Sequence, residues 1–263
     1  MVIRLSNLSV AKIRERFVKQ RALVSPQLLS EMHTDPRKGV RFACQTLKHR
    51  QEKENQEHRR VQFMLGYERA LWRSGAERVA GVDEAGVGPL AGPVVAAAVI
   101  FRPGTLIPKV DDSKRVRPKE RERLAKTIRR QALAVAIGVA EIDEIDTLNI
   151  YQAGILAMQR AVEELTQKPD HLLIDARKIA ALSIPQTSLV GGDRLSFSIA
   201  AASIVAKTFR DQMMADLGQK YPLYGFEKHK GYGTTAHREA IRRFGPCPQH
   251  RRSFAFTKKR HRR

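Results

Sequence analysis

Asp83 and Asp175 each end a short apolar stretch of the sequence, AGVD in one case and LLID in the other. Short apolar runs of this kind are typical of strands. In open α/β sheets the groups that perform chemistry gather at the carboxyl ends of strands, so acids from two strands can converge. Converging carboxylates repel one another unless a cation lies among them, and Mg²⁺ and Mn²⁺ prefer carboxylate oxygen. The pair therefore predicts a divalent-metal site.

Glu84 directly follows Asp83 and precedes a glycine cluster, in the stretch GVDEAGVGPLAGPVVAAAVI at residues 81–100. Successive strand residues point to opposite faces of a sheet, so Asp83 and Glu84 can share a site only if the strand ends or bulges there. Gly86 makes such a break feasible. The plainer alternative is that each acid simply ends a strand or caps the next turn.

The glycine cluster formally satisfies the dinucleotide-binding pattern G-x-G-x-x-A, in the segment GVGPLA. That pattern requires a helix to begin at the glycines. Here Pro89, Gly92 and Pro93 lead instead into the apolar run VVAAAVIF, which favours a strand. The dinucleotide interpretation is therefore disfavoured, but Gly86 and Gly88 would still expose backbone N–H groups to a phosphate or a sugar hydroxyl.

From Val79 onward, strand and helix patterns alternate, which predicts an α/β domain with helices packed on a sheet. The expected strands cover residues 78–83, 92–101, 133–142, 171–175 and 188–192. The expected helices cover residues 117–132, 144–167 and 196–221. Asp193 directly follows the fifth expected strand.

Residues 1–75 have helical patterns with little hydrophobic mass, and their charged run KHRQEKENQEHRR is typical of a solvated helix face. We expect a small helical N-terminal extension at 1–75, which could aid substrate binding. A catalytic domain at 76–256 and a basic tail at 257–263 would follow. The final stretch QHRRSFAFTKKRHRR contains seven Lys or Arg and no acid, which predicts a mobile arm that binds phosphates.

The balance of charge indicates a polyanionic partner. Forty-eight Lys and Arg against 27 Asp and Glu give a net charge of +21, and neutralised phosphates release counterions and so yield strong affinity. A merely soluble or ribosome-like basic surface is the alternative. Cys44 and Cys247 form no CxxC pattern, so neither a zinc site nor a disulfide framework is indicated. No signal-peptide core or spanning apolar run occurs, and we expect a cytoplasmic protein without a membrane partner.

Softer candidates lie in two further segments. The stretch YPLYGFEKHKGYGTTAH, residues 221–237, places aromatic faces among cations, which suits stacking on a nucleotide, although aromatics also anchor loops to a core. The cluster DSK at residues 112–114 is equally typical of a turn with a helix cap. His229, His237 and His250 lack metal-ligand spacing, and we expect them at the surface or bonded to the backbone.

Together these motifs resemble type 2 ribonuclease H (bacterial ribonuclease HII) over residues 78 to about 256. The motifs that carry the resemblance are GVDEAGVGPLAGPVVAAAVI, DSK, LLID, GGDRLSFSIAAASIVAKTFRD and YPLYGFEKHKGYGTTAH…FGPCPQHRRSF. The resemblance implies a ribonuclease H-like fold: a mixed five-stranded sheet flanked by helices, with added C-terminal helices. It implies a monomeric endonuclease that acts on RNA/DNA hybrids. It also implies incision 5′ of single ribonucleotides in duplex DNA, leaving 3′-hydroxyl and 5′-phosphate ends.

The resemblance also implies the site residues. The family's catalytic, metal-binding carboxylates match Asp83, Glu84, Asp175 and Asp193, which would hold two Mn²⁺ or Mg²⁺ ions. Its substrate-binding residues match Gly86, Val87, Gly88, Ser113, Lys114, Lys207, Lys230 and Tyr232. Tyr232 corresponds to the tyrosine that senses the RNA–DNA junction. Asp211 is a second possible fourth acid, and we expect it to be structural.

The sequence departs from the family pattern at three positions. Val87 stands where the family usually has Arg, Ala176 where Gly is common, and Gly192 where Lys is frequent. These departures bear on affinity for the junction more than on activity. Two competing functions are a nucleic-acid binder on a degenerate nuclease scaffold, against which the intact acids argue, and an ATP- or GTP-handling enzyme, for which no Walker motif G-x-x-x-x-G-K-[ST] occurs.

Overall fold

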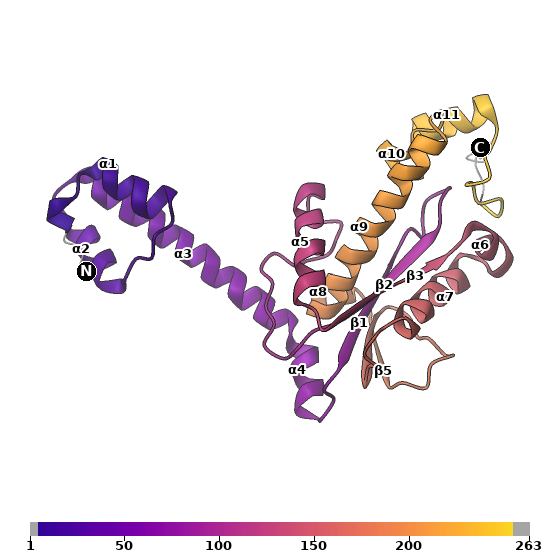
Figure 1. The fold of residues 1–263 in the computed structure, drawn as a ribbon, viewed down its shortest axis with the longest axis horizontal. Helices are drawn as coiled ribbons and strands as arrows, with labels where there is room; N and C mark the ends of the chain where they lie inside the picture. Colours follow the sequence, from indigo (N-terminus) through magenta and orange to yellow (C-terminus); the bar gives the residue numbers. More distant parts are fainter. Residues whose placement is uncertain (1–4, 255–263) are drawn as a thin grey trace, which may run out of the picture. The chain divides into compact units, whose positions relative to one another are not determined.

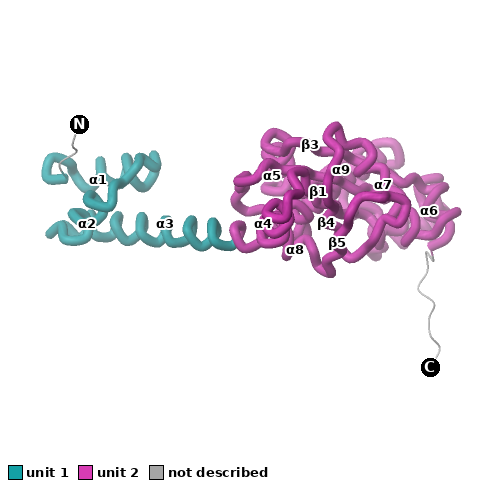
Figure 2. Tube along the Cα trace, turned by 90° about the horizontal axis from the view of Figure 1, so that it is seen from below, with its two compact units in different colours: residues 1–60 teal, residues 61–263 magenta. Residues whose placement is uncertain are grey.

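The computed structural model of the protein describes residues 5–254. The chain folds as two compact units, the first ending at Arg60 and the second beginning at Val61 (Figure 2). The predicted tail at 257–263 lies outside the described residues. Within those residues no helix is both long and apolar enough to cross a membrane.

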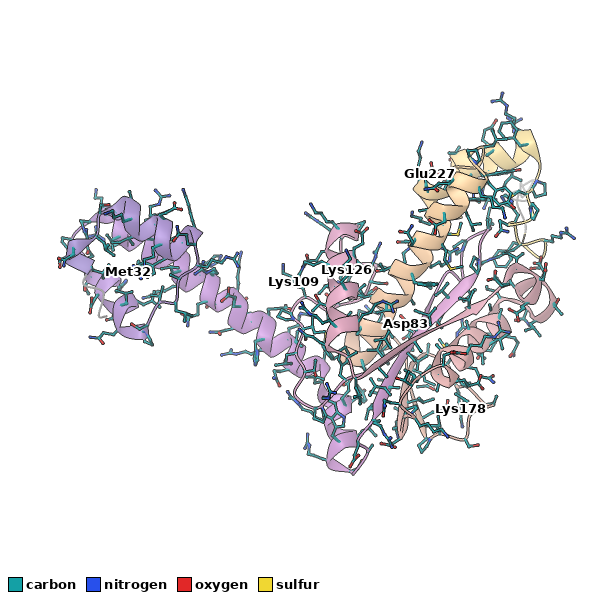
Figure 3. The ribbon with its side chains drawn as sticks, viewed as in Figure 1. Met32, Asp83, Lys109, Lys126, Lys178 and Glu227 are labelled. Carbon is teal, nitrogen blue, oxygen red and sulfur yellow. The ribbon has the colours of Figure 1, made fainter. Side chains whose placement is uncertain are left out.

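The first unit is helical. Its elements are η1 (Leu5–Asn7), α1 (Val10–Ile13), the π-helical η2 (Arg14–Lys19), α2 (Pro26–Thr34) and α3 (Lys38–Met64), whose last turn belongs to the second unit. Ser9 and Ser25 accept backbone N–H bonds at the starts of α1 and α2, as N-cap serines do. Its small core is centred on buried Ile13, Phe17 and Met32, and Met32 is labelled in Figure 3.

The second unit contains a five-stranded mixed sheet in the order β3-β2-β1-β4-β5. The strands are β1 (Val79–Ala85), β2 (Val94–Ile100), β3 (Ala134–Ala140), β4 (His171–Asp175) and β5 (Gln186–Leu189). β1 and β3 are each antiparallel to β2, whereas β4 is parallel to both β1 and β5. The predicted fold class is confirmed.

Helices cover both faces of the sheet (Figure 1). α5 (Pro118–Gln131) and α9 (Phe197–Lys220) pack on one face, and α6 (Ile142–Leu148) and α7 (Ile150–Glu163) on the other. The remaining helices are α4 (Gly66–Arg73), α8 (Gly192–Leu195), α10 (Phe226–His229) and α11 (Thr235–Phe244). α9 approaches β1 so closely that a Cβ on Gly81 would lie 2.1 Å from the Ser198 carbonyl carbon.

The single helix predicted over 144–167 is wrong, because the chain breaks it at Asn149. This residue has φ of 73°, outside the helical region, and separates α6 from α7. Its Oδ1 accepts the N–H groups of Tyr151 and Gln152. Asn is among the residues that adopt positive φ and also cap helices well, so one side chain both ends a helix and begins the next.

Candidate active site

Asp83 and Glu84 lie within β1, and the strand neither ends nor bulges at them. The antiparallel register continues through Asp83 opposite Ala97 and Glu84 opposite Ala96. Opposite residues share a face, and Ala97 belongs to the core beneath α9, whereas Ala96 belongs to the core beneath α7. The two adjacent acids therefore face opposite layers, and the break that Gly86 made feasible does not occur at them.

Asp175 meets Asp83 instead. In the parallel pairing of β1 with β4, Val82 lies opposite Ile174, so the next residues along each strand, Asp83 and Asp175, are neighbours on the α9 face. Asp83 is only 5% exposed, and Figure 3 shows it at the centre of the second unit. The expectation that strand ends bring two acids together thus agrees with the register.

Asp193 comes to the same place from the turn after β5. It is buried in α8, directly after Gly191 and Gly192. The N–H of Gly192 donates to Asp175 Oδ1 at 2.7 Å, which ties the two acidic segments together. Burial, followed by the charges of Asp112 and Asp175, raises the pKa of Asp193 to about 6.

The crowding of the acids is visible in their ionisation. Burial, then the charges of Glu84 and Asp175, raise the pKa of Asp83 well above its ordinary value. The Ser203 hydroxyl and the Glu84 N–H, the latter at 2.7 Å, bond the carboxylate and offset only part of this. Burial also raises the pKa of Glu84, although the Arg177 guanidinium, 3.5 Å from its Oε1, lowers it. Such shifts reflect carboxylates held together without enough compensating positive charge.

These residues fit a divalent cation in their chemistry and charge. All four offer hard oxygen ligands, and the buried Oε2 of Glu84 has no hydrogen-bond partner in residues 5–254. The side chains are not assembled into a closed cluster, since no three His, Cys, Asp or Glu in that range are placed to hold one ion as they stand. Local donors engage part of the set, as at Asp175 Oδ1.

The glycine segment, which consists of Gly86, Val87 and Gly88, lies just after Asp83 and Glu84 in the chain. Gly86 is buried with φ of 98° and faces Arg210, whose Nε would lie 2.0 Å from a Cβ at this position. Val87 is half-buried and Gly88 exposed. A Cβ on Gly88 would lie 3.8 Å from the Tyr232 ring, so the glycine segment and the candidate junction tyrosine are neighbours.

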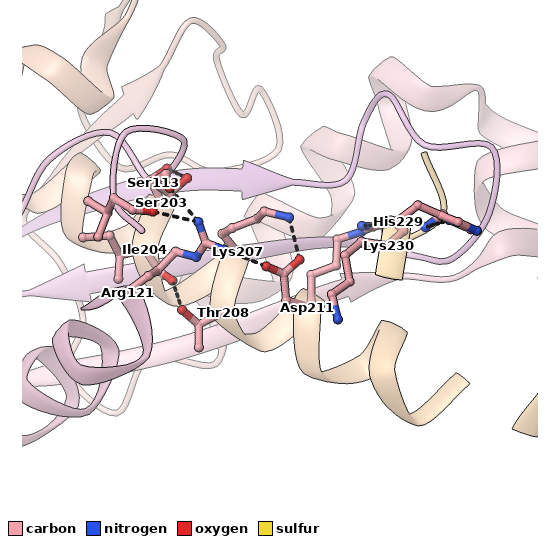
Figure 4. A network of polar contacts seen from close by, with 12 residues as sticks. Ser113, Arg121, Ser203, Ile204, Lys207, Thr208, Asp211, His229 and Lys230 are labelled. Carbon is pink, nitrogen blue, oxygen red and sulfur yellow. Dashed lines mark hydrogen bonds and ion pairs between the residues drawn. The ribbon is translucent and has the colours of Figure 1, made fainter. Parts of the chain in front are cut away.

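Tyr232 borders a basic cleft of about 530 Å³. Lys207, Lys230 and Tyr232 line this cleft, and Lys207 Nζ lies 5.8 Å from the centre of the Tyr232 ring. Asp211 bonds both Lys207, at 2.5 Å, and Arg121, at 2.9 Å (Figure 4). Asp211 is thus engaged by two largely covered cations, and the structural role expected for it agrees with these bonds.

Ser113 lies in the core, whereas the next residue, Lys114, lies on the surface. The buried Ser113 hydroxyl accepts a bond from Ser203 of α9 (Figure 4). Lys114 is exposed, and its charge lowers the pKa of both Glu84 and Asp193, so it lies beside the acids. Asp112 also faces Asp193, a contact that the sequence analysis missed because DSK resembled an ordinary turn.

The histidines are bonded to the backbone, one of the two predicted alternatives, and two of them are buried rather than at the surface. His237 and His250 are buried and share a bond between their Nε2 atoms at 3.1 Å, while His237 Nδ1 pairs with the Tyr232 carbonyl. His229 also pairs with backbone, through the Tyr224 carbonyl. Burial lowers the pKa of His237 to about 4. These rings support the Tyr232 segment from beneath.

The start of the predicted arm is also buried. Arg251 is fully enclosed and bonds backbone carbonyls of the glycine segment, and Ala91 forms an isolated bridge with His250. The prediction of a mobile arm is therefore wrong for residues 249–254. An HRRSF sequence gave no signal that its first arginine would point inward.

Comparisons with known proteins identify the family of this chain. The model of the Ribonuclease HII family matches residues 80–257, and that of the Ribonuclease HII N-terminal domain matches residues 9–72. Ribonuclease HII of Anaeromyxobacter sp. (strain Fw109-5) is 50% identical over 251 residues, covering 95% of this chain and 79% of that protein. Ribonuclease HII of Myxococcus xanthus is 50% identical over 94% of this chain and 85% of that protein.

A solved structure gives the same result for the fold. Ribonuclease H2 of Pyrococcus horikoshii OT3 matches with a TM-score of 0.59 and 25% identity, over 68% of this chain and 94% of that one. The family model, the relatives that are 50% identical over nearly the whole chain and the observed sheet all agree. This chain therefore belongs to the ribonuclease HII family and is a ribonuclease H, an enzyme that acts on RNA/DNA hybrids.

Proposed function

We propose that this ribonuclease H also incises duplex DNA on the 5′ side of single embedded ribonucleotides, leaving 3′-hydroxyl and 5′-phosphate ends. The observation that carries the proposal is the pairing of Asp83 and Asp175 on one face of the sheet, beside the glycine segment. Acids that could activate a water thus lie next to backbone groups that could meet a ribose. The whole site belongs to the second unit.

Asp83, Asp175 and Asp193 are the proposed side-chain ligands of Mg²⁺ or Mn²⁺. Glu84 is the proposed fourth ligand through its backbone carbonyl, because its side chain faces the other layer of the sheet. When bound, two such ions supply a more acidic water and neutralise charge on the phosphate and the leaving oxygen. The protein's own contribution is to hold the acids close together, where burial and like charges favour their protonated forms until a cation binds. Lys114 assists by lowering the pKa of Asp193 and Glu84, while Asp112 opposes it at Asp193.

The ribose is proposed to be recognised by the backbone of Gly86, Val87 and Gly88. The 2′-hydroxyl is the group that separates RNA from DNA at one position, and it can both donate and accept. Tyr232 is 43% exposed beside Gly88 and can stack on the neighbouring deoxyribose. This pairing would favour a ribonucleotide that is followed by DNA.

Positive charge around the site is proposed to hold the duplex. Lys114, Lys207 and Lys230 lie on the surface or line the cleft beside Tyr232, and Ser113 supports this region from the core. The N-terminal extension, proposed as residues 1–75, would add affinity, and the enzyme would act as a cytoplasmic monomer. Lys and Arg contacts to phosphates make binding fall steeply with salt.

A cleavage assay tests the proposal on three matched duplexes: one with a single ribonucleotide, a long RNA/DNA hybrid, and all DNA. We expect Mg²⁺- or Mn²⁺-dependent cutting of the first two, with the first cut 5′ of the ribonucleotide and ends mapped as 3′-hydroxyl and 5′-phosphate. Cutting of the hybrid alone would reject the single-ribonucleotide activity. Asp83→Asn should abolish both, whereas Asp216→Asn, on an exposed part of α9, should change neither.

The contribution of the extension needs a carefully chosen truncation. Val61, Met64 and Leu65 pack in the core of the second unit, and Glu68 caps α9 there. A chain that begins at Val61 therefore removes the first unit without damaging the core, whereas one that begins at Ala76 would do both. We expect the shorter chain to cleave with an unchanged kcat and a higher KM. An unchanged KM would remove the first unit from substrate binding.

A further inference from the structure

Two fully buried arginines enclose the segment between β1 and β2, residues 86–93, which we term the glycine loop. Arg210 comes from α9 and Arg251 from the segment after α11, and both are 0% exposed. Within residues 5–254, every hydrogen bond that either guanidinium makes goes to a backbone carbonyl rather than to a carboxylate. Buried arginines are normally paired with acids, so this arrangement needs an explanation.

The carbonyl partners of the two arginines are concentrated in the glycine loop. Arg251 bonds the carbonyls of Gly86, Val87, Pro89 and Gly92 at 2.5, 3.0, 2.8 and 2.9 Å. Arg210 bonds those of Pro93, Ala91 and Lys230 at 2.9, 3.0 and 3.0 Å. The rigid fork of guanidinium donors suits such a task, because several acceptors are fixed by one planar group.

The amide groups of the same loop are not all bonded within the fold. The N–H groups of Leu90 and Gly92 are bonded to the carbonyls of Gly231 and Gln249. Those of Val87 and Gly88 have no acceptor in residues 5–254. Carbonyls held inward by cations, with neighbouring N–H groups left unbonded, resemble the backbone nests that bind anions.

The charge of the arginines acts in the same direction. Burial lowers the pKa of Arg210 to about 10, and burial together with the Arg210 charge lowers that of Arg251 to about 9. Both side chains therefore stay cationic at neutral pH. Two positive charges beneath the loop favour an anionic ligand above it. Arg210 packs so closely on Gly86 that its Nε would lie 2.0 Å from a Cβ at this position, so only glycine leaves room for the arginine side chain.

We propose that Arg251 and Arg210 are positioning residues, which hold the carbonyls of the glycine loop inward so that the N–H groups of Val87 and Gly88 stay fixed for the ribose and phosphate of the substrate. The inference rests on the proposed function. Neither arginine touches substrate; each acts through the backbone that does. Their loss would thus affect recognition of the ribonucleotide before it affects the acids.

Arg251→Lys and Arg210→Lys test this role, because lysine keeps the charge but not the planar fork. The matched control is Arg160→Lys on α7, which also bonds a backbone carbonyl, that of Val139, but none of whose hydrogen bonds within residues 5–254 goes to the glycine loop. Binding to a single-ribonucleotide duplex and to the all-DNA duplex is measured by competition in EDTA, where no cleavage occurs. Steady-state cleavage in Mn²⁺ and thermal midpoints accompany it.

We expect wild type to prefer the ribonucleotide duplex, and the preference to approach one in the two loop variants. Their kcat/KM should fall about tenfold to a hundredfold through misplaced contacts, with most of the change in KM, while Arg160→Lys stays within about twofold of wild type. A merely structural role would lower the thermal midpoint and leave the preference intact. Arg210→Lys decides the matter if Arg251→Lys does not fold.

The two possible failures are distinct. A wild-type enzyme without any preference for the ribonucleotide duplex overturns the proposed function and this inference with it. A wild-type preference that survives in the folded loop variants overturns the inference alone.

Discussion

The acids of β1 and the arginines under the glycine loop are both ionisable groups buried in the fold, but their charges are compensated in different ways. Asp83 is 5% exposed and Arg210 and Arg251 are 0% exposed. Together, the two arginines donate seven hydrogen bonds of 3.0 Å or less to backbone carbonyls. Asp83 instead has like charges beside it, which, with burial, raise its pKa well above the ordinary value.

The difference follows from which backbone group a loop can offer. A guanidinium has five N–H donors, and a loop whose carbonyls turn inward can satisfy them without any acid. A carboxylate needs donors or a cation, and Asp83 receives the N–H of Glu84 but lies beside Asp175. The positive charge of the two arginines is therefore compensated by carbonyls of the fold, whereas the negative charge of the acid cluster is compensated only when a ligand binds. Such unfavourable sites are commonly tolerated where function requires them.

The most direct way to break this comparison is to neutralise one charge from each region. Asp83→Asn should lower cleavage about a thousandfold, since several kcal/mol of metal-assisted stabilisation are lost. In EDTA it should nonetheless raise the free energy of unfolding, because a repelled, buried charge is gone. Arg251→Met should lower that free energy by about 3 kcal/mol, because several buried carbonyls lose their donor.

Urea unfolding in EDTA, with cleavage in Mn²⁺ measured in parallel, checks both signs. Asp216→Asn, exposed on α9, is the control and should leave both quantities near wild type. If Asp83→Asn destabilised the fold as much as Arg251→Met does, the acids would be compensated within the protein and the contrast would be lost.

Glu68 sharpens the comparison, because it is a buried acid with several donors at Oε1, although its buried Oε2 has no partner in residues 5–254. It is 2% exposed, and its Oε1 accepts the Ser198 N–H at 2.9 Å and the hydroxyls of Ser196 and Ser198 at the start of α9. Negative charge at a helix N-terminus is favourable. Glu68→Gln should therefore destabilise the fold by about 1–2 kcal/mol, opposite in sign to Asp83→Asn.

The measurement is again urea unfolding in EDTA, and Glu77→Gln, in the turn between α4 and β1, is a control outside the helix cap. A stabilising Glu68→Gln would mean that burial alone, not the supply of donors, decides how these acids behave.

Metal and pH test the acid cluster through stability alone. Asp193 has a pKa of about 6 in the folded protein against 3.8 ordinarily, with Asp112, Asp175 and Lys114 facing it. The folded state thus binds this proton more tightly, so its contribution to the free energy of unfolding falls as pH rises from about 4 to about 6. His237, with a pKa lowered to about 4, contributes in the opposite sense between about 4 and 6.5.

A divalent cation that binds the deprotonated acids should reverse the loss from Asp193 and leave the His237 contribution unchanged. The rise in thermal midpoint caused by Mn²⁺ over EDTA should therefore be small near pH 5 and grow above pH 6. Asp193→Asn should reduce this rise, whereas His237→Gln should keep it. A metal-induced rise that is equal at both pH values, or unaffected by Asp193→Asn, would argue against a shared acid site.

The parts of this site that sequence could predict are those in which each residue acts through its own strand. Asp83 and Asp175 end apolar runs, and parallel pairing of β1 with β4 makes them neighbours. The opposite orientation of Glu84 also follows from strand alternation, but the sequence does not reveal that Gly86 comes after a strand that runs regularly to Ala85. Register, unlike strand identity, depends on the partner strand.

The arginines could not be predicted for a different physical reason. Arg210 lies in a largely apolar helix of mixed charge and Arg251 in a basic tail sequence, and arginines are usually solvated. What buries them is a set of backbone carbonyls more than 100 residues away along the chain. Every residue has a backbone carbonyl, so the sequence does not show which carbonyls will bond a buried arginine. The bond between the His237 and His250 rings also joins residues whose contact no sequence pattern indicates.

The smallest expected effect concerns Val87, in the middle of the glycine segment. Its carbonyl is held by Arg251 and its side chain is only half-buried, so Val87→Arg can add a phosphate contact without disturbing the loop. Affinity for a ribonucleotide duplex should rise a few-fold, and the slope of log affinity against log salt should steepen by about one. Leu148→Arg, on α6 and 41% exposed, adds the same charge away from the loop and should leave the slope nearly unchanged. An equal steepening in both variants would show that added charge acts at long range rather than through the glycine loop.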